Sequence, residues 1–189
     1  MKTKIIIRLF AMMLLVASLL TGCQSPQLHS PSPNTVSLAT RNNCYSLLHE
    51  LLAEQKDVSL LRFIKSERPD VKNLVKRIAT TSGTGAKLLE KFAKDDPSIR
   101  LDDLRLPPGE LGTRAAIAAT KQKDLLSKTG DEFELTLLLT QTEALSYATH
   151  LAKVAAQNEP QPDRAQALAG VSNDMANLYH EVFGLLLAK

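Results

Sequence analysis

The chain has 189 residues, a length that fits about one domain. Hydrophobic residues make up 44% and charged residues 23%, which are ordinary values for a folded protein and exclude a disordered, collagen-like or low-complexity chain. The formal net charge is +3, from 23 basic and 20 acidic side chains. Aromatic residues are only 4% and Trp is absent, so the core must come mainly from Leu and Ala, which favour helices. We therefore expect an all-α domain.

Residues 1–22 are expected to be a signal peptide. Lys2, Lys4 and Arg8 form a basic start, and the apolar run 9–20 that follows is too short for an ordinary membrane span. The run ends in Leu20-Thr21-Gly22-Cys23, which resembles the lipobox of bacterial lipoproteins, with an aliphatic residue three positions before the Cys and small residues between. The resemblance implies lipidation of the Cys23 thiol by diacylglycerol, followed by cleavage. The alternative is a plain secretory signal with an incidental cysteine.

The lipobox resemblance also implies a location. One acyl chain binds a membrane only marginally, but a lipoprotein cysteine carries several, so the anchor on Cys23 would be effectively permanent. In enteric-type lipoproteins, a residue other than Asp after the Cys implies transfer to the outer membrane, and Gln24 stands there. We expect a protein of the bacterial cell envelope that is lipid-anchored in the outer membrane and faces the periplasm.

Removal of the signal peptide changes the charge balance. Lys2, Lys4 and Arg8 leave with it, so 20 basic and 20 acidic side chains remain. Without a basic surplus, binding to nucleic acid through its phosphates loses its main driving force, and we expect no nucleic-acid partner. After Cys23, residues 24–34 are rich in Pro and Ser and predict a passive tether, about 34 Å long if it is polyproline-like.

The remainder, residues 35–189, is predicted to be a helical bundle domain. Periodicity and breaking residues predict helices at about 35–55, 69–95, 110–128, 131–157 and 163–188, with Asp57 capping a short continuation through Val58, Leu61 and Ile64. Gly130 is expected to end the third of these helices. Residues 98–109 predict an ordered irregular crossing, because Ile99, Leu101, Leu104 and Leu106 supply apolar anchors. The short connections favour an antiparallel bundle of four to five helices.

The apolar positions of three helices predict which faces turn inward. In the first, they are Cys44, Leu47, Leu48, Leu51 and Leu52. In the second, they are Val71, Leu74, Val75, Ile78, Ala79, Ser82, Ala86, Leu89, Phe92 and Ala93. In the last, they are Ala165, Leu168, Ala169, Met175, Ala176, Tyr179, Val182, Phe183 and Leu186. Cys44, the one thiol left after lipidation of Cys23, is thus expected to be a buried apolar residue rather than a disulfide partner or a reactive site.

The junction at residues 125–134, LLSKTGDEFE, carries a second resemblance. It is similar to the Leu-x-x-Leu-x-Gly-x-x-Phe-Asp junction of a ferritin-like helical-bundle family found in bacterial envelope proteins and of unknown function. The helix order and the Pro-containing crossing agree over about residues 47–187. The resemblance implies a ferritin-like up-and-down arrangement. The family's Asp-His pair falls on Ser82-Gly83 and its later His near Leu145, so the candidate metal ligands of the family are missing here.

The residues themselves also argue against a metal site. A di-metal carboxylate bundle needs Glu-x-x-His on two helices, but the residues three before His49, His150 and His180 are not Glu: they are Ser46, Tyr147 and Asn177. These histidines would have to meet with acidic neighbours such as Glu50 or Glu181, which diverge from them by about 100° on a helix. We expect no metal and no cofactor.

Two further patterns resemble chemistry but lack its requirements. The string at residues 82–87, SGTGAK, resembles a phosphate-binding loop, but the Walker pattern, the hydroxyl after the lysine and the preceding strand are missing, so no nucleotide is expected. Its small residues instead favour a close helix crossing or a kink. No Gly-x-Ser-x-Gly elbow is present, and Cys44 is far in sequence from His150 and His180. We expect no catalytic residues, and we interpret Asp95-Asp96 and Asp102-Asp103 as solvated or capping charges.

Apolar residues in excess of one helical face occur at two places, Val58 to Ile64 and Phe183 to Leu187, and burial is favoured over an exposed docking patch. The leading hypothesis is a non-enzymatic lipoprotein that acts through contacts with an envelope protein in a structural, chaperone-like or accessory role. The alternatives are a ferritin-like metal or redox protein, and a carrier with a small-ligand cavity beside Ser82, Gly83 and Gly85.

Overall fold

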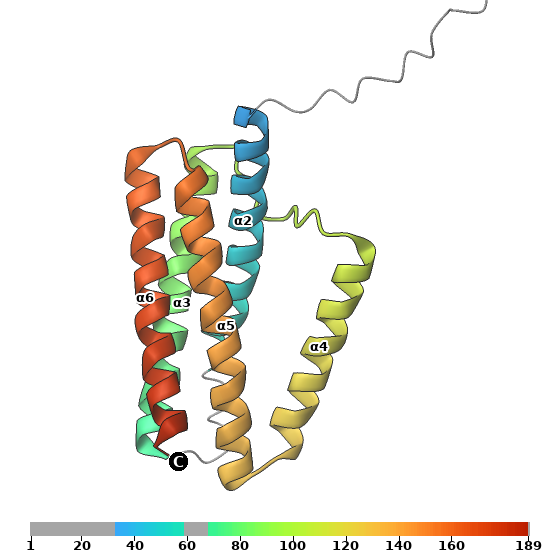
Figure 1. Cartoon of the computed structure of the whole chain (residues 1–189), viewed down its shortest axis with the longest axis vertical. Helices are drawn as coiled ribbons and strands as arrows, with labels where there is room; N and C mark the ends of the chain where they lie inside the picture. The colour runs from blue at the N-terminus through green and yellow to red at the C-terminus, as the bar shows by residue number, and fades with distance from the viewer. Residues whose placement is uncertain (1–32, 59–67, 189) are drawn as a thin grey trace, which may run out of the picture. The chain divides into compact units, whose positions relative to one another are not determined.

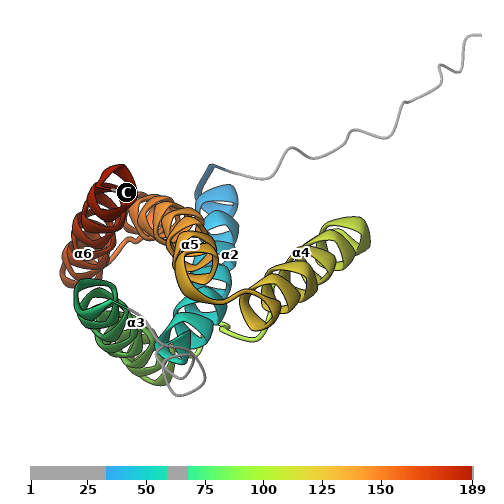
Figure 2. The same cartoon turned by 90° about the horizontal axis from the view of Figure 1, so that it is seen from below.

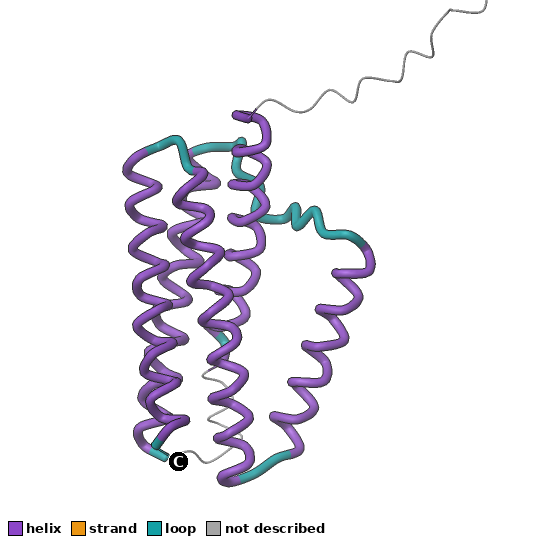
Figure 3. Tube along the Cα trace, viewed as in Figure 1, coloured by secondary structure: helices purple, strands orange, loops and turns teal. Residues whose placement is uncertain are grey.

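The computed structural model describes residues 33–58 and 68–188, and the regular secondary structure of this part is entirely helical (Figure 3). The helices are α2 (Pro33–Lys56), α3 (Pro69–Asp95), α4 (Pro108–Ser127), α5 (Gly130–Asn158) and α6 (Pro162–Leu187). The prediction of an all-α fold with four to five helices is confirmed over the described residues, which form five. Cys23, the signal peptide, most of the tether, and Leu61 and Ile64 of the predicted continuation lie outside the described residues. None of the described helices has the length and apolar character needed to cross a membrane.

Proline marks the beginning of four of the five described helices, α2 at Pro33 among them. Pro69, Pro108 and Pro162 each occupy the first turn of a helix, where the missing N–H costs nothing. The N-terminus of α3 is also capped from a distance, because the backbone N–H of Arg68 donates to the buried carboxylate of Glu134 on α5. Gly130 does not end the third helix as predicted: α4 ends at Ser127, and Gly130 begins α5 with a φ of +55°, a conformation that favours glycine.

Four of the helices form the core of the described bundle. Going around it, α2 packs against α3, α3 against α6, α6 against α5, and α5 against α2 (Figure 2). Neighbours in this ring are antiparallel, so α3 and α5 run in the same direction (Figure 1). The chain returns between them through residues 96–107 and α4, and α4 packs mainly against α5. This long connection places α4 beside α5, and the groove described below lies between α4 and its neighbours.

The predicted inner faces of α2 and α3 are confirmed, with Leu51, Phe92 and Ala93 half-buried against the core. On α2, Cys44, Leu47, Leu48 and Leu52 are buried, and on α3 the buried set runs from Val71 to Leu89 at the expected spacing. In the crossing, Ile99 is buried and three leucines pack half-buried against the core, as predicted: Leu101, Leu104 and Leu106.

The prediction for α6 is wrong at two positions. Ala169 and Phe183 are exposed, whereas Val171, Ser172 and Leu178 are buried in their stead. The inner face of α6 therefore follows 168, 171, 172, 175, 178 and 182, and Phe183 lies just beyond its edge, stacked on Tyr179 with 6.2 Å between the ring centroids. Leu187 is also exposed, at 75%. The apolar excess at this end of the chain is thus divided: Leu185 and Leu186 pack half-buried against the core, whereas Phe183 and Leu187 are exposed, against our expectation.

The small residues of α3 allow a close approach to α2. A Cβ atom at Gly85 would lie 2.9 Å from Cδ1 of Leu52, and one at Gly83 would lie 3.6 Å from Cβ of Lys56. This confirms that the small residues allow a close helix crossing. It also corrects the expected position of a ligand cavity, because Leu52 packs directly over Gly85.

Candidate functional site

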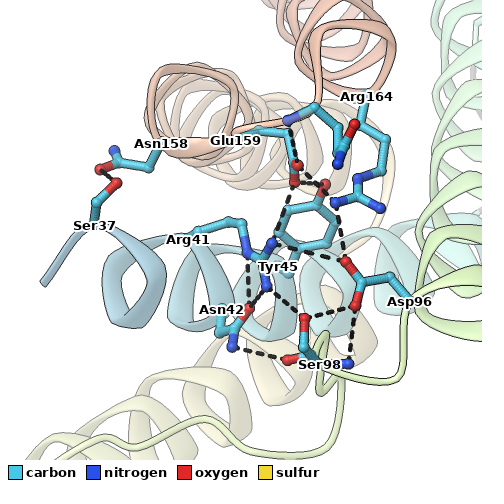
Figure 4. Close-up of polar contacts among 10 residues, drawn as sticks. Ser37, Arg41, Asn42, Tyr45, Asp96, Ser98, Asn158, Glu159 and Arg164 are labelled. Carbon is cyan, nitrogen blue, oxygen red and sulfur yellow. Dashed lines mark hydrogen bonds and ion pairs between the residues drawn. The ribbon is translucent and has the colours of Figure 1, made fainter. Parts of the chain in front are cut away.

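A buried ionic network joins four segments at the end of the bundle where α5 meets α6 (Figure 4). We call it the Glu159 network, and its members are Arg41, Asn42, Tyr45, Asp96, Ser98, Glu159 and Arg164. Tyr45 donates to Glu159 Oε2 at 2.8 Å, and Arg164 Nη2 donates to Glu159 Oε1 at 2.8 Å and to Asp96 Oδ2 at 3.0 Å. The Arg41 guanidinium lies 3.9 Å from Asp96 and 4.0 Å from Glu159. Two positive and two negative charges thus balance one another.

The surroundings of Glu159 favour the charged form of its carboxyl group. Burial raises the pKa of a carboxyl, but hydrogen bonds from Arg164, Tyr45 and the backbone of Gln161 outweigh burial and lower the pKa of Glu159. The pKa of Tyr45 is raised, first by burial and then by its hydrogen bond to Glu159. The Glu159 side chain and Tyr45 are both 0% exposed, so no substrate reaches them while the helices are packed. The network therefore joins α2, the crossing and the turn between α5 and α6 through buried, charge-assisted contacts.

Asp96 differs from its sequence interpretation. Hydrogen bonds from Ser98, opposed by burial and assisted by the nearby arginines, lower the pKa of Asp96. Its carboxylate accepts from the Ser98 backbone N–H at 3.0 Å in the turn that follows α3, and Arg164 also pairs with it. Asp96 is therefore part of a buried ion network and not only a solvated charge.

The three histidines of the described part do not come together. His49 lies 3.3 Å from Glu90 on α3, whereas the ring of His150 contacts the carbonyl oxygen of Ser146 one turn earlier on its own helix. His180 is exposed and packs edge-on against Tyr179. Among the described residues, no three His, Cys, Asp or Glu side chains form a group that could hold a metal ion.

Cys44 lies on the inner face of α2. It is a free thiol with 7% exposure, and burial raises its pKa. The thiolate is the reactive form of cysteine, so this environment disfavours nucleophilic or redox chemistry. The predicted burial of Cys44 is confirmed.

The other distinctive feature is a groove between α4 and the helices α2 and α5. We call it the α4 groove; its volume is about 880 Å³. Its lining residues are Leu51, Glu54, Gln55, Asp57, Glu110, Arg114, Ile117, Ala118, Lys121, Gln122, Leu125, Leu126, Thr140, Glu143, Ala144 and Tyr147. The groove exists because α4 packs poorly, with Leu125 as the one buried residue among its 20. Ile117 and Leu126, at 49% and 47% exposure, leave apolar surface in the groove open to solvent.

Polar contacts bridge α4 to α5 along this groove. Arg114 Nη2 donates to the Tyr147 hydroxyl at 2.7 Å, and its guanidinium carbon lies 5.1 Å from the centre of the Tyr147 ring. Lys121 pairs with Glu143. These contacts lie near the surface, where an ion pair contributes about 0–1 kcal/mol. These contacts position α4, but α4 lacks the many buried side chains that hold α5 and α6 in the core.

Sequence reasoning missed both features, although the first left a signal. Arg41, Tyr45, Leu48 and Leu52 follow one another at helical spacing, so a charged residue stands on the inner face of α2 and requires a buried partner. The α4 groove left a weaker signal. Residues 115–119 of α4 read AAIAA, which defines a helix but no narrow apolar face.

Compared with known proteins, the chain matches no family model, and neither a curated protein nor a solved structure is significantly similar to it.

Proposed function

We propose that this protein is a non-catalytic lipoprotein of the bacterial envelope that acts by binding another protein along α4. The observation that carries the proposal is the packing of α4. A 20-residue helix with one buried residue and with Leu111 and Ile117 exposed leaves an apolar surface that a partner would cover. The described residues also support a binding role, because the buried carboxylate of Glu159 is held by Arg164 and Tyr45 and the Cys44 thiol is buried.

The anchor is the second part of the proposal. The basic start, the short apolar run and the lipobox ending in Cys23 support lipidation, and Gln24 supports outer-membrane localisation facing the periplasm. The Pro- and Ser-rich residues 24–34 then act as a spacer between membrane and bundle. In this arrangement the membrane partner is bound only through the lipid, and α4 remains available to a protein.

A ferritin-like arrangement is the finer form of the fold that we propose. Its support is the course of the chain: α3 and α5 run in the same direction, and the crossing with α4 makes one long connection between them, as in ferritin-like bundles. The resemblance of residues 125–134 to the junction of a ferritin-like envelope family points the same way. The proposal concerns topology alone and includes no metal.

Photocrosslinking in intact cells tests the binding role. A benzophenone amino acid replaces Ile117 in the groove in one strain and Leu139 in the other; the two side chains have similar exposure, 49% and 51%, and Leu139 lies outside the groove. We expect a discrete crosslinked protein from position 117 and not from position 139. Equal products at both positions, or none at position 117, would contradict a binding role for α4.

A carrier of an apolar small molecule is the second candidate, and the volume of the α4 groove favours it, because ligand sites range over about 300–1,000 Å³. Native mass spectrometry of the chain extracted from cells separates the two. A carrier would show a bound mass that the Ile117→Gln variant loses, whereas a protein-binding surface would show the bare chain.

A further inference from the structure

The shape of the α4 groove defines what kind of protein segment fits it, provided that the proposed binding role is right. The lining residues of α4 run from Glu110 to Leu126, which at the rise of an α-helix corresponds to about 24 Å. Apolar side chains from three helices line it between charged and polar ones: Leu51, Ile117, Ala118, Leu125 and Ala144. An elongated groove with apolar side chains between helices is the kind of surface that takes the apolar face of an amphipathic helix.

Of the four carboxylates that line the α4 groove, two form ion pairs with other described residues and two do not. Two of its carboxylates are matched within the protein, since Glu110 accepts from Arg114 Nε at 2.8 Å and Glu143 pairs with Lys121. The other two, Glu54 and Asp57, lie together near the end of α2, and no ion pair joins either of them to another described residue.

The surroundings of Glu54 and Asp57 leave this edge negative. Glu50 lies one turn before Glu54, and burial together with this like charge raises the pKa of Glu54. Lys56 lines a neighbouring hollow together with Glu54 and Asp57, but it forms no ion pair with either of them and does not line the groove. The α2 edge of the groove therefore presents two carboxylates that form no ion pair with another described residue.

We propose that the α4 groove binds a basic amphipathic helix of a partner protein. The apolar face of that helix covers Ile117, and its Lys or Arg side chains, spaced one turn apart along one flank, face Glu54 and Asp57. A fatty acid or an anionic lipid would bring its negative group to the same two carboxylates. A second copy of this chain, bound through the same surface, would bring two such acidic edges together. Both alternatives, the anionic lipid and the second copy, would therefore place negative charge against negative charge.

Binding of designed peptides to the full-length chain in phosphatidylcholine nanodiscs tests this, with empty nanodiscs as the blank. The probe is a labelled 18-residue amphipathic helix with Leu and Ala on one face and Lys on both flanks. The comparison peptide has Glu in place of every Lys. We expect the Lys peptide to bind in a salt-sensitive manner and the Glu peptide not to bind.

Two variants locate the binding. Glu54→Lys with Asp57→Lys should weaken the Lys peptide about tenfold or more, because two attractions become repulsions, and should improve the Glu peptide. Asp95→Lys with Asp174→Lys, the same charge change outside the groove, should leave both affinities unchanged. Ile117→Gln should weaken the Lys peptide, and Leu139→Gln should not.

The outcomes separate this inference from the proposed function. Binding of both peptides alike, binding that the Glu54/Asp57 reversal leaves intact, or no peptide binding at all would overturn the basic-helix inference. A dimer of the full-length chain that Ile117→Gln dissociates would also overturn it, by making a second copy the occupant. In each case a discrete crosslink from position 117 would leave the proposed function standing, whereas its absence would remove the proposed function itself.

Discussion

Single residues decide the stability of the bundle where charge is buried. Glu159 lies between the guanidinium of Arg164 and the hydroxyl of Tyr45, with no exposure of its side chain. Such a carboxylate is stable in this position only because its partners replace the water that it loses. The four segments of the Glu159 network are separated by up to 123 positions in sequence, from Arg41 to Arg164, so one cluster of contacts holds distant parts of the chain together.

Removing the charge of Glu159 should therefore be costly. We predict that Glu159→Gln lowers the free energy of unfolding by about 3–5 kcal/mol at pH 7, because Arg41 and Arg164 are left with Asp96 as their one carboxylate. Glu110→Gln, which breaks an exposed pair with Arg114, should cost under about 1 kcal/mol. Urea unfolding followed by circular dichroism measures both values. Similar losses for the two variants would show that the network contributes no more than a surface pair.

The same carboxylate predicts a pH dependence. The pKa of Glu159 is lower in the folded protein than in the unfolded chain, so its stabilisation is complete above the ordinary pKa of a glutamate, about 4.3, and is lost as the pH falls through the lowered value. The difference in stability between the original chain and Glu159→Gln should thus shrink on going from pH 7 to pH 3. An undiminished difference at pH 3 would contradict the lowered pKa. Asp96 shifts in the same direction and adds to the loss in acid.

The two glycines of α3 should respond in opposite ways to alanine. A helical Gly→Ala change alone stabilises by about 0.5–1 kcal/mol. At Gly83 the new Cβ has an ordinary 3.6 Å contact, so Gly83→Ala should give this gain. At Gly85 it would lie 2.9 Å from Cδ1 of Leu52, a side chain that is fully buried, so we expect the displaced packing to outweigh the gain and Gly85→Ala to destabilise by about 1 kcal/mol net. Thermal unfolding of both variants checks this. An equal increase in stability for both would contradict the prediction, because Leu52 of α2 would then move aside at little cost.

At the scale of elements, the helices were more predictable than their packing. Every predicted helix boundary lies within two residues of the observed one, because Pro69, Pro108 and Pro162 fix the beginnings and Asp96-Pro97 and Pro160 follow the ends. The inner faces of α2 and α3 followed from their spacing. The faces of α4 and α6 followed less well: the Ala-rich middle of α4 has no single apolar side, and Phe183 carries an apolar side chain at the edge of the buried face.

The Glu159 network was out of reach for a different reason. Its partners meet only once α2, the crossing and the turn between α5 and α6 have packed, and no local pattern specifies that meeting. Arg41 on an apolar face indicated that a partner was needed, but not which one. The α4 groove similarly depends on how far one helix lies from its neighbours, which periodicity does not record.

Leu125 should hold α4 against the core. It is the buried residue of α4, so Leu125→Ala removes the main apolar contact of this helix. We predict that limited proteolysis then cleaves within α4, while the cooperative unfolding of the core changes little. Leu137→Ala, at a fully buried position of α5, should instead lower the free energy of global unfolding by about 2–5 kcal/mol. Equal global losses for both variants would mean that α4 is an integral part of the core.

For the whole molecule, anchoring and binding are separate functions of separate segments in our proposal. Cys23 supplies the anchor, residues 24–34 the spacing and the bundle the binding surface. We predict that Cys23→Ser blocks lipidation and lipoprotein-type processing, while the bundle still folds because Cys23 lies outside it. Fractionation of cells and circular dichroism of the product measure the two properties. A Cys23→Ser product that is fully cleaved and still partitions with membranes would contradict the anchor.

The central claim is that α4 is held loosely on a stable four-helix core, which leaves its surface available to the proposed partner. Hydrogen exchange of the full-length chain in nanodiscs measures this directly, because amides report the free energy of local opening. We predict that the amides of α4 exchange on the order of 100-fold faster than those in the middle of α5 and α6, since α4 contributes one buried side chain and those helices contribute many. Protection of α4 equal to that of α5 would contradict the claim, because α4 would then be part of the core and not a surface held open for a partner.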